Sequence, residues 1–313
     1  MKRNMCTSPC IPAFLSLTLA VGLATPVLAG PSFTLDTALA AAEKGDAKAL
    51  YFMARHYARG EGVPQDDARA AQCLRQAAEK GYALAQNDFG AFCATGRGVP
   101  QDLAEAARWY QKAAQQGDAL AAFSLGRAYW LGCGVATNAW ASIAWLKKAA
   151  KQRQVEALEL LGEIYLNGGP GLERDPRQSF QWFLKAADLG SAEALAHLGS
   201  LFEDGDGVAR NVGLAVHCYQ AAAEKGETQA MLSLSRLCLA GMDEKPDAVE
   251  ACKWLCLAGR QGDGHANHLK NMLQLQGRVT GPQYEVASRR ADDFERAFLN
   301  RKPGDSRQPG GLK

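Results

Sequence analysis

Residues 81–116 read GYALAQNDFGAFCATGRGVPQDLAEAARWYQKAAQQ, and the rest of the chain repeats their pattern. Small residues open the stretch, and apolar residues then recur at the spacing of one helical face. A glycine turn from Gly96 to Asp102 follows, and a second apolar stripe ends in the small pair Ala113 and Ala114. The pattern predicts two helices joined by a turn, with small residues that let neighbouring helices approach closely.

The pattern returns in six copies between Gly45 and Gln261, at 45–80, 81–116, 117–152, 153–189, 190–225 and 226–261. A helix-turn-helix unit of this size cannot bury its own apolar face, so it is stable only when stacked on neighbours. The sequence therefore predicts an all-α fold, a right-handed α-solenoid of helix-turn-helix repeats.

Each turn closes on an Asp or Asn whose side chain can accept hydrogen bonds from the free N–H groups of the next helix. These predicted N-caps are Asp66, Asp102, Asn138, Asp175, Asn211 and Asp247. Arg153 stands where the other copies open with glycine, and the sixth turn, Gly241 to Pro246, lacks its second glycine. Both departures predict altered loops within an unchanged architecture.

The ends of the chain predict separate segments. Lys2 and Arg3 precede an apolar stretch that closes at Ala29, which is typical of a signal peptide over residues 1–29. An uncleaved anchor is the alternative. We expect a periplasmic or secreted protein with no stable membrane span after cleavage. An N-terminal capping helix is predicted within 30–44, C-terminal capping helices within 262–301, and a disordered tail over 302–313.

Charge and motifs exclude several function classes. Without the leader's Lys2 and Arg3, the 35 basic residues fall to 33 and equal the 33 acidic ones. A nucleic-acid binder normally carries a basic face, so we expect no nucleic-acid partner. The chain has no Gly-Lys dipeptide for a phosphate loop, no H-E-x-x-H and no G-x-S-x-G. His56, His197 and His217 fall at different repeat positions. We therefore expect no enzyme activity, no cofactor and no metal site.

The unit G-D-A-x-A-x-x-x-x-A/G-x-x-Y-x-x-G-x-G-V-x-x-D-x-x-x-A-x-x-W/Y-x-x-A-A resembles the Sel-one-like repeat, a relative of the tetratricopeptide repeat, over residues 45–261. The resemblance implies a scaffold that holds a protein or peptide partner. Some cysteine-rich relatives are described as β-lactamases, so binding or hydrolysis of β-lactams or cell-wall fragments is the alternative. Against it, the chain contains no S-x-x-K, no S-D-N and no K-T-G.

Four cysteines occupy matching repeat positions. Cys73 and Cys93 lie twenty residues apart, on the second helix of one copy and the first helix of the next, and Cys218 and Cys238 fill the same positions. In an oxidising compartment this predicts the disulfides Cys73–Cys93 and Cys218–Cys238, with buried free thiols as the alternative. The intervening copies place aromatic pairs there: Trp109 with Tyr129, Trp145 with Tyr165, and Trp182 with Phe202.

The remaining cysteines give weaker signals. Cys252 and Cys256, followed by His265 and His268, offer two sulfurs and two imidazoles that could bind zinc. Buried core cysteines with surface histidines are the favoured interpretation. Cys133, in a glycine turn, is the odd thiol, either free or paired with another chain.

The binding surface is predicted from the repeat register. In stacked helix pairs the first helices line the concave face, and exposed Trp, Tyr and Arg are residue types that anchor interfaces. The sequence identifies neither the partner nor the oligomeric state. The predicted groove residues are Tyr51, Arg55, Asn87, Phe123, Arg127, Trp130, Glu159, Glu163, Leu232 and Arg236.

Overall fold

The computed structural model describes residues 34–241 and 245–299. In this part of the chain the backbone forms tandem helices, and a single bridge between Gly169 and Leu172 is its only extended pairing. The predicted all-α solenoid of helix-turn-helix repeats is confirmed. No helix of the described residues is both long enough and apolar enough to cross a membrane. The chain divides into two compact units within one helix, α9 (Val155–Asn167).

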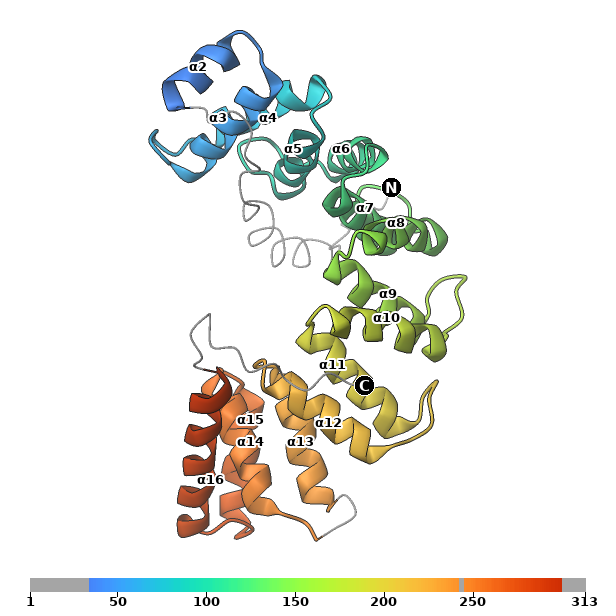
Figure 1. Cartoon of the computed structure of the whole chain (residues 1–313), viewed down its shortest axis with the longest axis vertical. Coiled ribbons are helices and arrows are strands. Elements are labelled where there is room, and N and C mark those ends of the chain that lie inside the picture. The colour runs from blue at the N-terminus through green and yellow to red at the C-terminus, as the bar shows by residue number, and fades with distance from the viewer. Residues whose placement is uncertain (1–33, 242–244, 300–313) are drawn as a thin grey trace, which may run out of the picture. The chain divides into compact units, whose positions relative to one another are not determined.

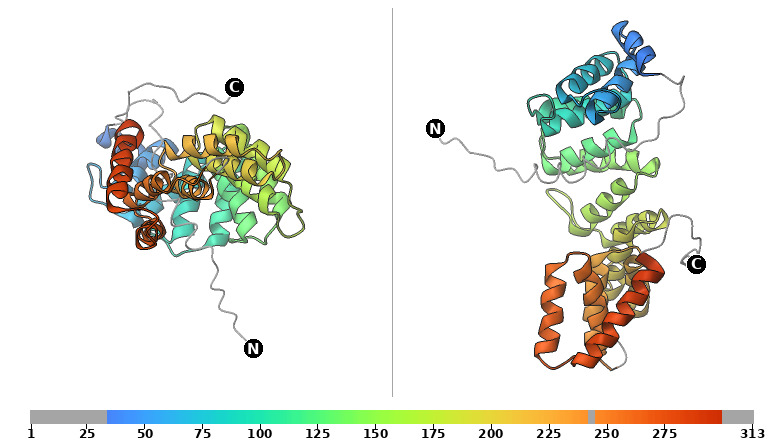
Figure 2. Two further views of the ribbon diagram at one scale, coloured as in Figure 1. Left: turned by 90° about the horizontal axis from the view of Figure 1, so that it is seen from below. Right: turned by 90° about the vertical axis from the view of Figure 1, so that its left-hand side faces the viewer.

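The first unit runs to Ala157 and includes residues 169–172. Within each of its repeats the two helices pack against each other, and each second helix packs against the first helix of the next repeat. Figure 2 shows these helices, blue to green, stacked in successive layers. They are α2 (Leu35–Glu43), α3 (Ala47–Arg59), α4 (Asp67–Glu79), α5 (Ala83–Thr95), α6 (Leu103–Gln115), α7 (Ala119–Leu131) and α8 (Ala139–Lys151).

The second unit holds the rest of α9 and the helices that follow it. At its C-terminal end α14 packs against both α15 and α16, drawn in orange and red in Figure 1. Its helices are α10 (Pro176–Asp188), α11 (Ala192–Asp204), α12 (Val212–Ala223), α13 (Thr228–Ala240), α14 (Ala248–Arg260), α15 (Gly264–Leu275) and α16 (Gly281–Phe294), and a π-helical segment, Glu295–Leu299, follows.

The start of every second helix is fixed as the sequence predicted. Asp66 accepts a hydrogen bond from the backbone N–H of Arg69 at 2.9 Å, and Asp102 accepts one from Glu105 at 2.8 Å. Asn138, Asp175, Asn211 and Asp247 cap their helices in the same way. The side chains satisfy N–H groups that have no partner inside the helix.

Glycine inside the first helices lies beneath large side chains of the second helices. A Cβ on Gly90 would lie 2.8 Å from the Tyr110 ring and 3.2 Å from the carbonyl oxygen of Ala106. Gly162 under Phe183 and Gly199 under Tyr219 repeat the arrangement. Gly126 lies under Leu146 in the same way. Two other repeats with a leucine at this second-helix position hold a larger residue in place of the glycine: Ala54 with Leu74, and Ser235 with Leu255.

The turns also depend on close approach between repeats. A Cβ on Gly98 would lie 2.0 Å from the carbonyl oxygen of Asp67, at the start of the preceding second helix. The second glycine of the turn is therefore required by packing. Arg153, which replaces the opening glycine of the fourth copy, keeps the left-handed backbone with φ at 63°. The altered residue leaves the path of the chain unchanged.

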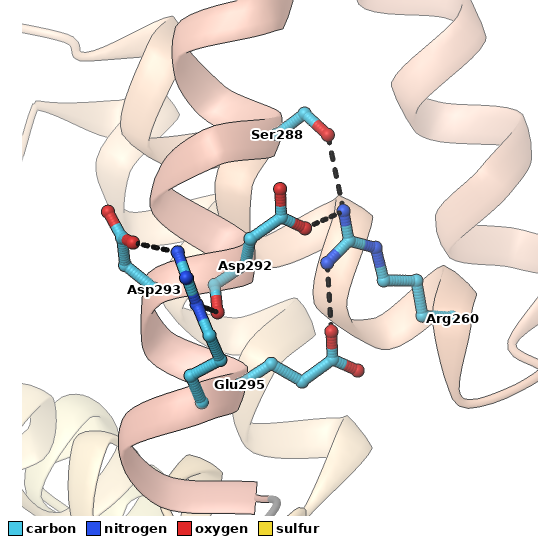
Figure 3. A network of polar contacts seen from close by, with 6 residues as sticks. Arg260, Ser288, Asp292, Asp293 and Glu295 are labelled. Carbon is cyan, nitrogen blue, oxygen red and sulfur yellow. Dashed lines mark hydrogen bonds and ion pairs between the residues drawn. The ribbon is translucent and has the colours of Figure 1, made fainter.

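Figure 3 shows the polar contacts that tie α14 to the last helix. The guanidinium of Arg260 lies 2.7 Å from Asp292 and 2.9 Å from Glu295, and it donates to Ser288 at 3.2 Å. One side chain thus joins three groups of the closing segment, which fixes that segment against the repeat stack.

Candidate binding surface

The first helices of the first unit carry six of the predicted groove residues, and four of these are buried. Tyr51 and Arg127 are 9% and 8% exposed, Asn87 is 5% exposed and Phe123 is 4% exposed. The expectation of an open row of side chains was therefore wrong at these positions. Only Arg55 and Trp130 among the six are half-buried.

A polar cluster explains part of this burial. The Tyr51 hydroxyl donates to Asp88 at 2.9 Å, and the Asn87 amide donates to the other Asp88 oxygen at 3.1 Å. Tyr82 lies edge-on to the Tyr51 ring, with 5.2 Å between centroids. The cluster links α3 to α5. Sequence reasoning missed Asp88, because an acidic residue stands at this repeat position in the second copy alone and the shared pattern does not include it.

Burial controls the electrostatics of this cluster. It raises the pKa of Asp88 to about 6, while hydrogen bonds from Tyr51 and Asn87 act in the opposite direction. Arg55 also favours the ionised carboxylate. The Asn87 carbonyl oxygen is buried and has no hydrogen-bond partner among the described residues. An acceptor of this kind is rare in a native fold and calls for an explanation.

Phe123 and Arg127, the two predicted groove residues that are buried on α7, pack against each other. The Arg127 guanidinium lies over the Phe123 ring, 5.5 Å from its centroid, and burial lowers the pKa of Arg127. A Cβ on Gly169 would lie 2.4 Å from the Trp130 ring, so this ring rests against the loop after α9. Trp140, which sequence reasoning did not select, is the more exposed tryptophan at 64%.

The second unit carries a cluster of two glutamates and one histidine. Ligand atoms of Glu163 on α9 and of Glu193 and His197 on α11 all lie within 4.8 Å of one another. Burial, with the charges of Glu193 and Glu159, raises the pKa of Glu163. Burial lowers the pKa of His197, against the effect of Glu227. Glu159 and Glu163 were predicted as groove residues, but Glu193 and His197 were not.

Neighbouring side chains hold this cluster in place. The His197 ring stacks on Phe183 with centroids 4.4 Å apart and an interplanar angle of 12°. Ser191, the N-cap of α11, donates its hydroxyl to Glu159 at 2.5 Å and accepts from the backbone N–H of Ala194. The histidine and one of its acidic neighbours are thus fixed by contacts within the unit.

The two predicted residues on α13 have structural contacts. Arg236 donates to both oxygens of Glu203 at 2.6 Å, and Tyr219 donates to the same carboxylate at 3.1 Å. The hydrogen bond from Arg236 is the largest cause of the lowered pKa of Glu203. Leu232 is half-buried against the core of the second unit. A ligand of Arg236 would therefore have to compete with Glu203.

The cysteines of the two predicted disulfides are free in the structure. Cys73 and Cys93 lie on packed helices, as do Cys218 and Cys238. Burial raises the pKa of Cys93 to about 12 and that of Cys218 to about 11. Trp109, at the position that matches Cys73, lies edge-on to Phe89 at 5.6 Å between centroids. Both disulfides stay predictions.

The two C-terminal cysteines, Cys252 and Cys256, share a hydrogen bond between their thiols. A hydrogen bond from the Cys252 thiol lowers the pKa of Cys256 to about 7, against the effect of burial. Both sulfurs are buried, whereas His265 and His268 are exposed. These four residues do not form a ligand cluster in the described part of the chain. Cys133 is not among the free cysteines.

Comparison with known proteins places these features in a family. A model of the Sel1 repeat matches residues 47–82, 83–118, 119–153, 155–191, 192–227 and 228–263. The chain belongs to the Sel1 repeat family. Each Sel1 repeat in this match starts two residues after the predicted copy. Sel1 repeat proteins generally mediate protein–protein interaction and are generally non-enzymatic scaffolds.

Two solved Sel1-type structures are similar to the chain. One is a protective antigen present in uropathogenic Escherichia coli strains, with an SLR fold, a TM-score of 0.73 and 29% identity. That match covers 84% of this chain but only 56% of the antigen. The other is a Sel1 repeat protein from Oxalobacter formigenes, with a TM-score of 0.62 and 27% identity, covering 72% of this chain and 88% of that protein. The curated proteins give no match.

Proposed function

We propose that this protein is an exported scaffold that holds a protein or peptide partner along the first helices of its repeats. Membership of the Sel1 repeat family supports the general role in protein interaction. The location of the binding surface and the export of the chain are the specific parts of the proposal.

The unpartnered carbonyl oxygen of Asn87 carries the proposal. A buried acceptor without a hydrogen bond costs about 1–3 kcal/mol, so a partner that displaces the side chains above this oxygen and supplies a donor would be favoured there. Arg55 and Tyr82 are half-buried beside the same cluster and offer a cation and an aromatic ring. An acceptor, a cation and a ring together suit a peptide, which presents backbone N–H groups as well as carbonyl and side-chain groups.

Site-specific photocrosslinking in intact cells tests the surface. A photoreactive residue at Arg55 or Tyr82 should capture a partner, whereas the same residue at Gln72 or Gln76, both exposed on α4, should not. Asn87→Ala should weaken the capture at Arg55; because it also removes the hydrogen bond to Asp88, its capture is compared with that of Gly90→Ala, a variant destabilised inside a repeat. Equal capture from all four positions, or capture only from α4, would disprove the proposed surface.

Export is tested separately. The predicted leader lies outside the described residues, so the proposal rests on Lys2, Arg3 and the apolar stretch up to Ala29. The N-terminal sequence of protein recovered from the periplasm or medium should begin at Gly30. A protein that stays in the cytoplasm with Met1 intact would contradict export and leave the crosslinking result to be judged separately.

A further inference from the structure

We infer that Glu163, Glu193 and His197 form a zinc-binding site on the first helices of the fourth and fifth repeats. The site goes beyond partner binding, because an ion can occupy it whether or not a partner is present. It also differs from the cysteine-histidine set considered from the sequence.

The three side chains converge from two helices. Glu193 and His197 are four residues apart on α11 and so lie on one face of that helix. Glu163 comes from α9, and the three ligand atoms lie within 4.8 Å of one another. Zinc bonds of roughly 2.0–2.2 Å to nitrogen and oxygen place tetrahedral ligands about 3.4 Å apart. Small side-chain rotations of the two glutamates are enough to close that difference.

The charge around the site favours a cation. None of the ion pairs formed by the described residues involves Glu163 or Glu193. Glu159 and Glu227 add further negative charge close by. Like charges held together without a cation repel each other, and a divalent ion would remove that repulsion.

The ligand types favour zinc over the hard cations. Calcium and magnesium prefer oxygen ligands alone, whereas imidazole is a ligand for zinc and other transition metals. Two carboxylates and one histidine give three protein ligands, which leaves a fourth position for water or for a ligand atom of another molecule. The stacking of His197 on Phe183 fixes the plane of the imidazole ring before any ion binds.

Isothermal titration of the full mature chain with zinc tests the inference. We expect one zinc per chain from this site, and a loss of affinity of at least about 100-fold in both Glu193→Gln and His197→Gln, since loss of outer-shell partners alone costs 10- to 100-fold. Glu193 is exposed, so its variant should fold normally. His217→Gln and Glu173→Gln, at exposed positions of the same unit, are the matched controls and should bind as the wild type does.

Cobalt substitution separates this site from the thiols. A cobalt complex of Glu163, Glu193 and His197 should lack the charge-transfer absorption of cobalt thiolates. Absence of zinc binding, binding unchanged in both ligand variants, cobalt thiolate absorption as the only signal, or calcium and magnesium affinities equal to that for zinc would each overturn the inference.

Discussion

Replacing Gly90 with alanine should destabilise the protein, although this substitution ordinarily stabilises a helix. In a helix interior, alanine is favoured over glycine by about 0.8–1.0 kcal/mol. Here the new methyl group would lie 2.8 Å from the Tyr110 ring and 3.2 Å from the Ala106 carbonyl oxygen. Tyr110 is 1% exposed and Ala106 contributes a backbone atom, so neither can move aside easily.

Overpacking of this kind costs about 1–3 kcal/mol, so the clash outweighs the helix preference. We expect a net loss of about 1 kcal/mol in the free energy of unfolding, seen as a lower urea midpoint by circular dichroism with little change in slope. Gly264→Ala is the matched control, because nothing lies within 4 Å of the new Cβ at the start of α15. The control should be neutral or slightly stabilising.

A double variant tests the cause. Tyr110→Leu alone should lose stability because it leaves space in the core. Gly90→Ala combined with Tyr110→Leu recreates the natural pair Ala54 and Leu74 of the first repeat, so the loss should be smaller than the sum of the two single losses. Strict additivity, or a Gly90→Ala variant more stable than the wild type, would refute the reasoning.

Three further predictions concern the backbone, a buried acid and the thiols. Arg153→Gly should raise the free energy of unfolding by about 0.5–1 kcal/mol, measured as a higher urea midpoint. A side chain at φ 63° costs about 1–2 kcal/mol, and the greater chain entropy of glycine offsets part of the gain. A lower midpoint would contradict this. Burial raises the pKa of Asp88 from its ordinary value of 3.8 to about 6, so the stabilising contribution of the protonated carboxyl is fully present below pH 3.8 and is lost as the pH rises through 6. Asp88→Asn should remove this loss of stability between pH 4 and pH 7. If the urea midpoint changes between these two pH values by the same amount in the wild type and in Asp88→Asn, the prediction is wrong. Peptide mapping of exported protein without reduction should recover Cys73 linked to Cys93 and Cys218 linked to Cys238, whereas free alkylation of all four thiols would disprove the disulfides.

The repeat framework was predictable because its signals are local. An N-cap such as Asp102 accepts a hydrogen bond from a backbone group three residues away, and Gly96 ends the preceding helix, α5. These contacts recur in every copy, so six imperfect copies reinforce one interpretation. The pairing of Gly90 with Tyr110 was not predicted, because its cause is the short distance between the two helices.

The binding surface was less predictable because its contacts join different repeats. Tyr51 and Asn87 were expected to be exposed, since the apolar stripe of each helix pair does not include them. They are buried because Asp88 of the next first helix and Tyr82, the residue before that helix, complete a polar cluster around Tyr51. A glutamate and a histidine four residues apart, Glu193 and His197, were visible in the sequence, but only stacking places Glu163 beside them.

Framework contacts such as that of Gly90 with Tyr110 lie within a repeat, whereas candidate binding residues such as Arg55 lie at the surface of the first helices. Variants can therefore test folding and binding separately. In a stack where each repeat contacts only its neighbours, stability is a sum of repeat and interface contributions. Residues such as Gly90 and Tyr110 lie inside a repeat, so their variants lower stability whatever the protein binds. Arg55 is half-buried and Glu193 is exposed, and both lie on first helices of the repeats. Loss of partner capture or zinc binding in variants of these two residues, with an unchanged urea midpoint, would therefore report on the surface itself.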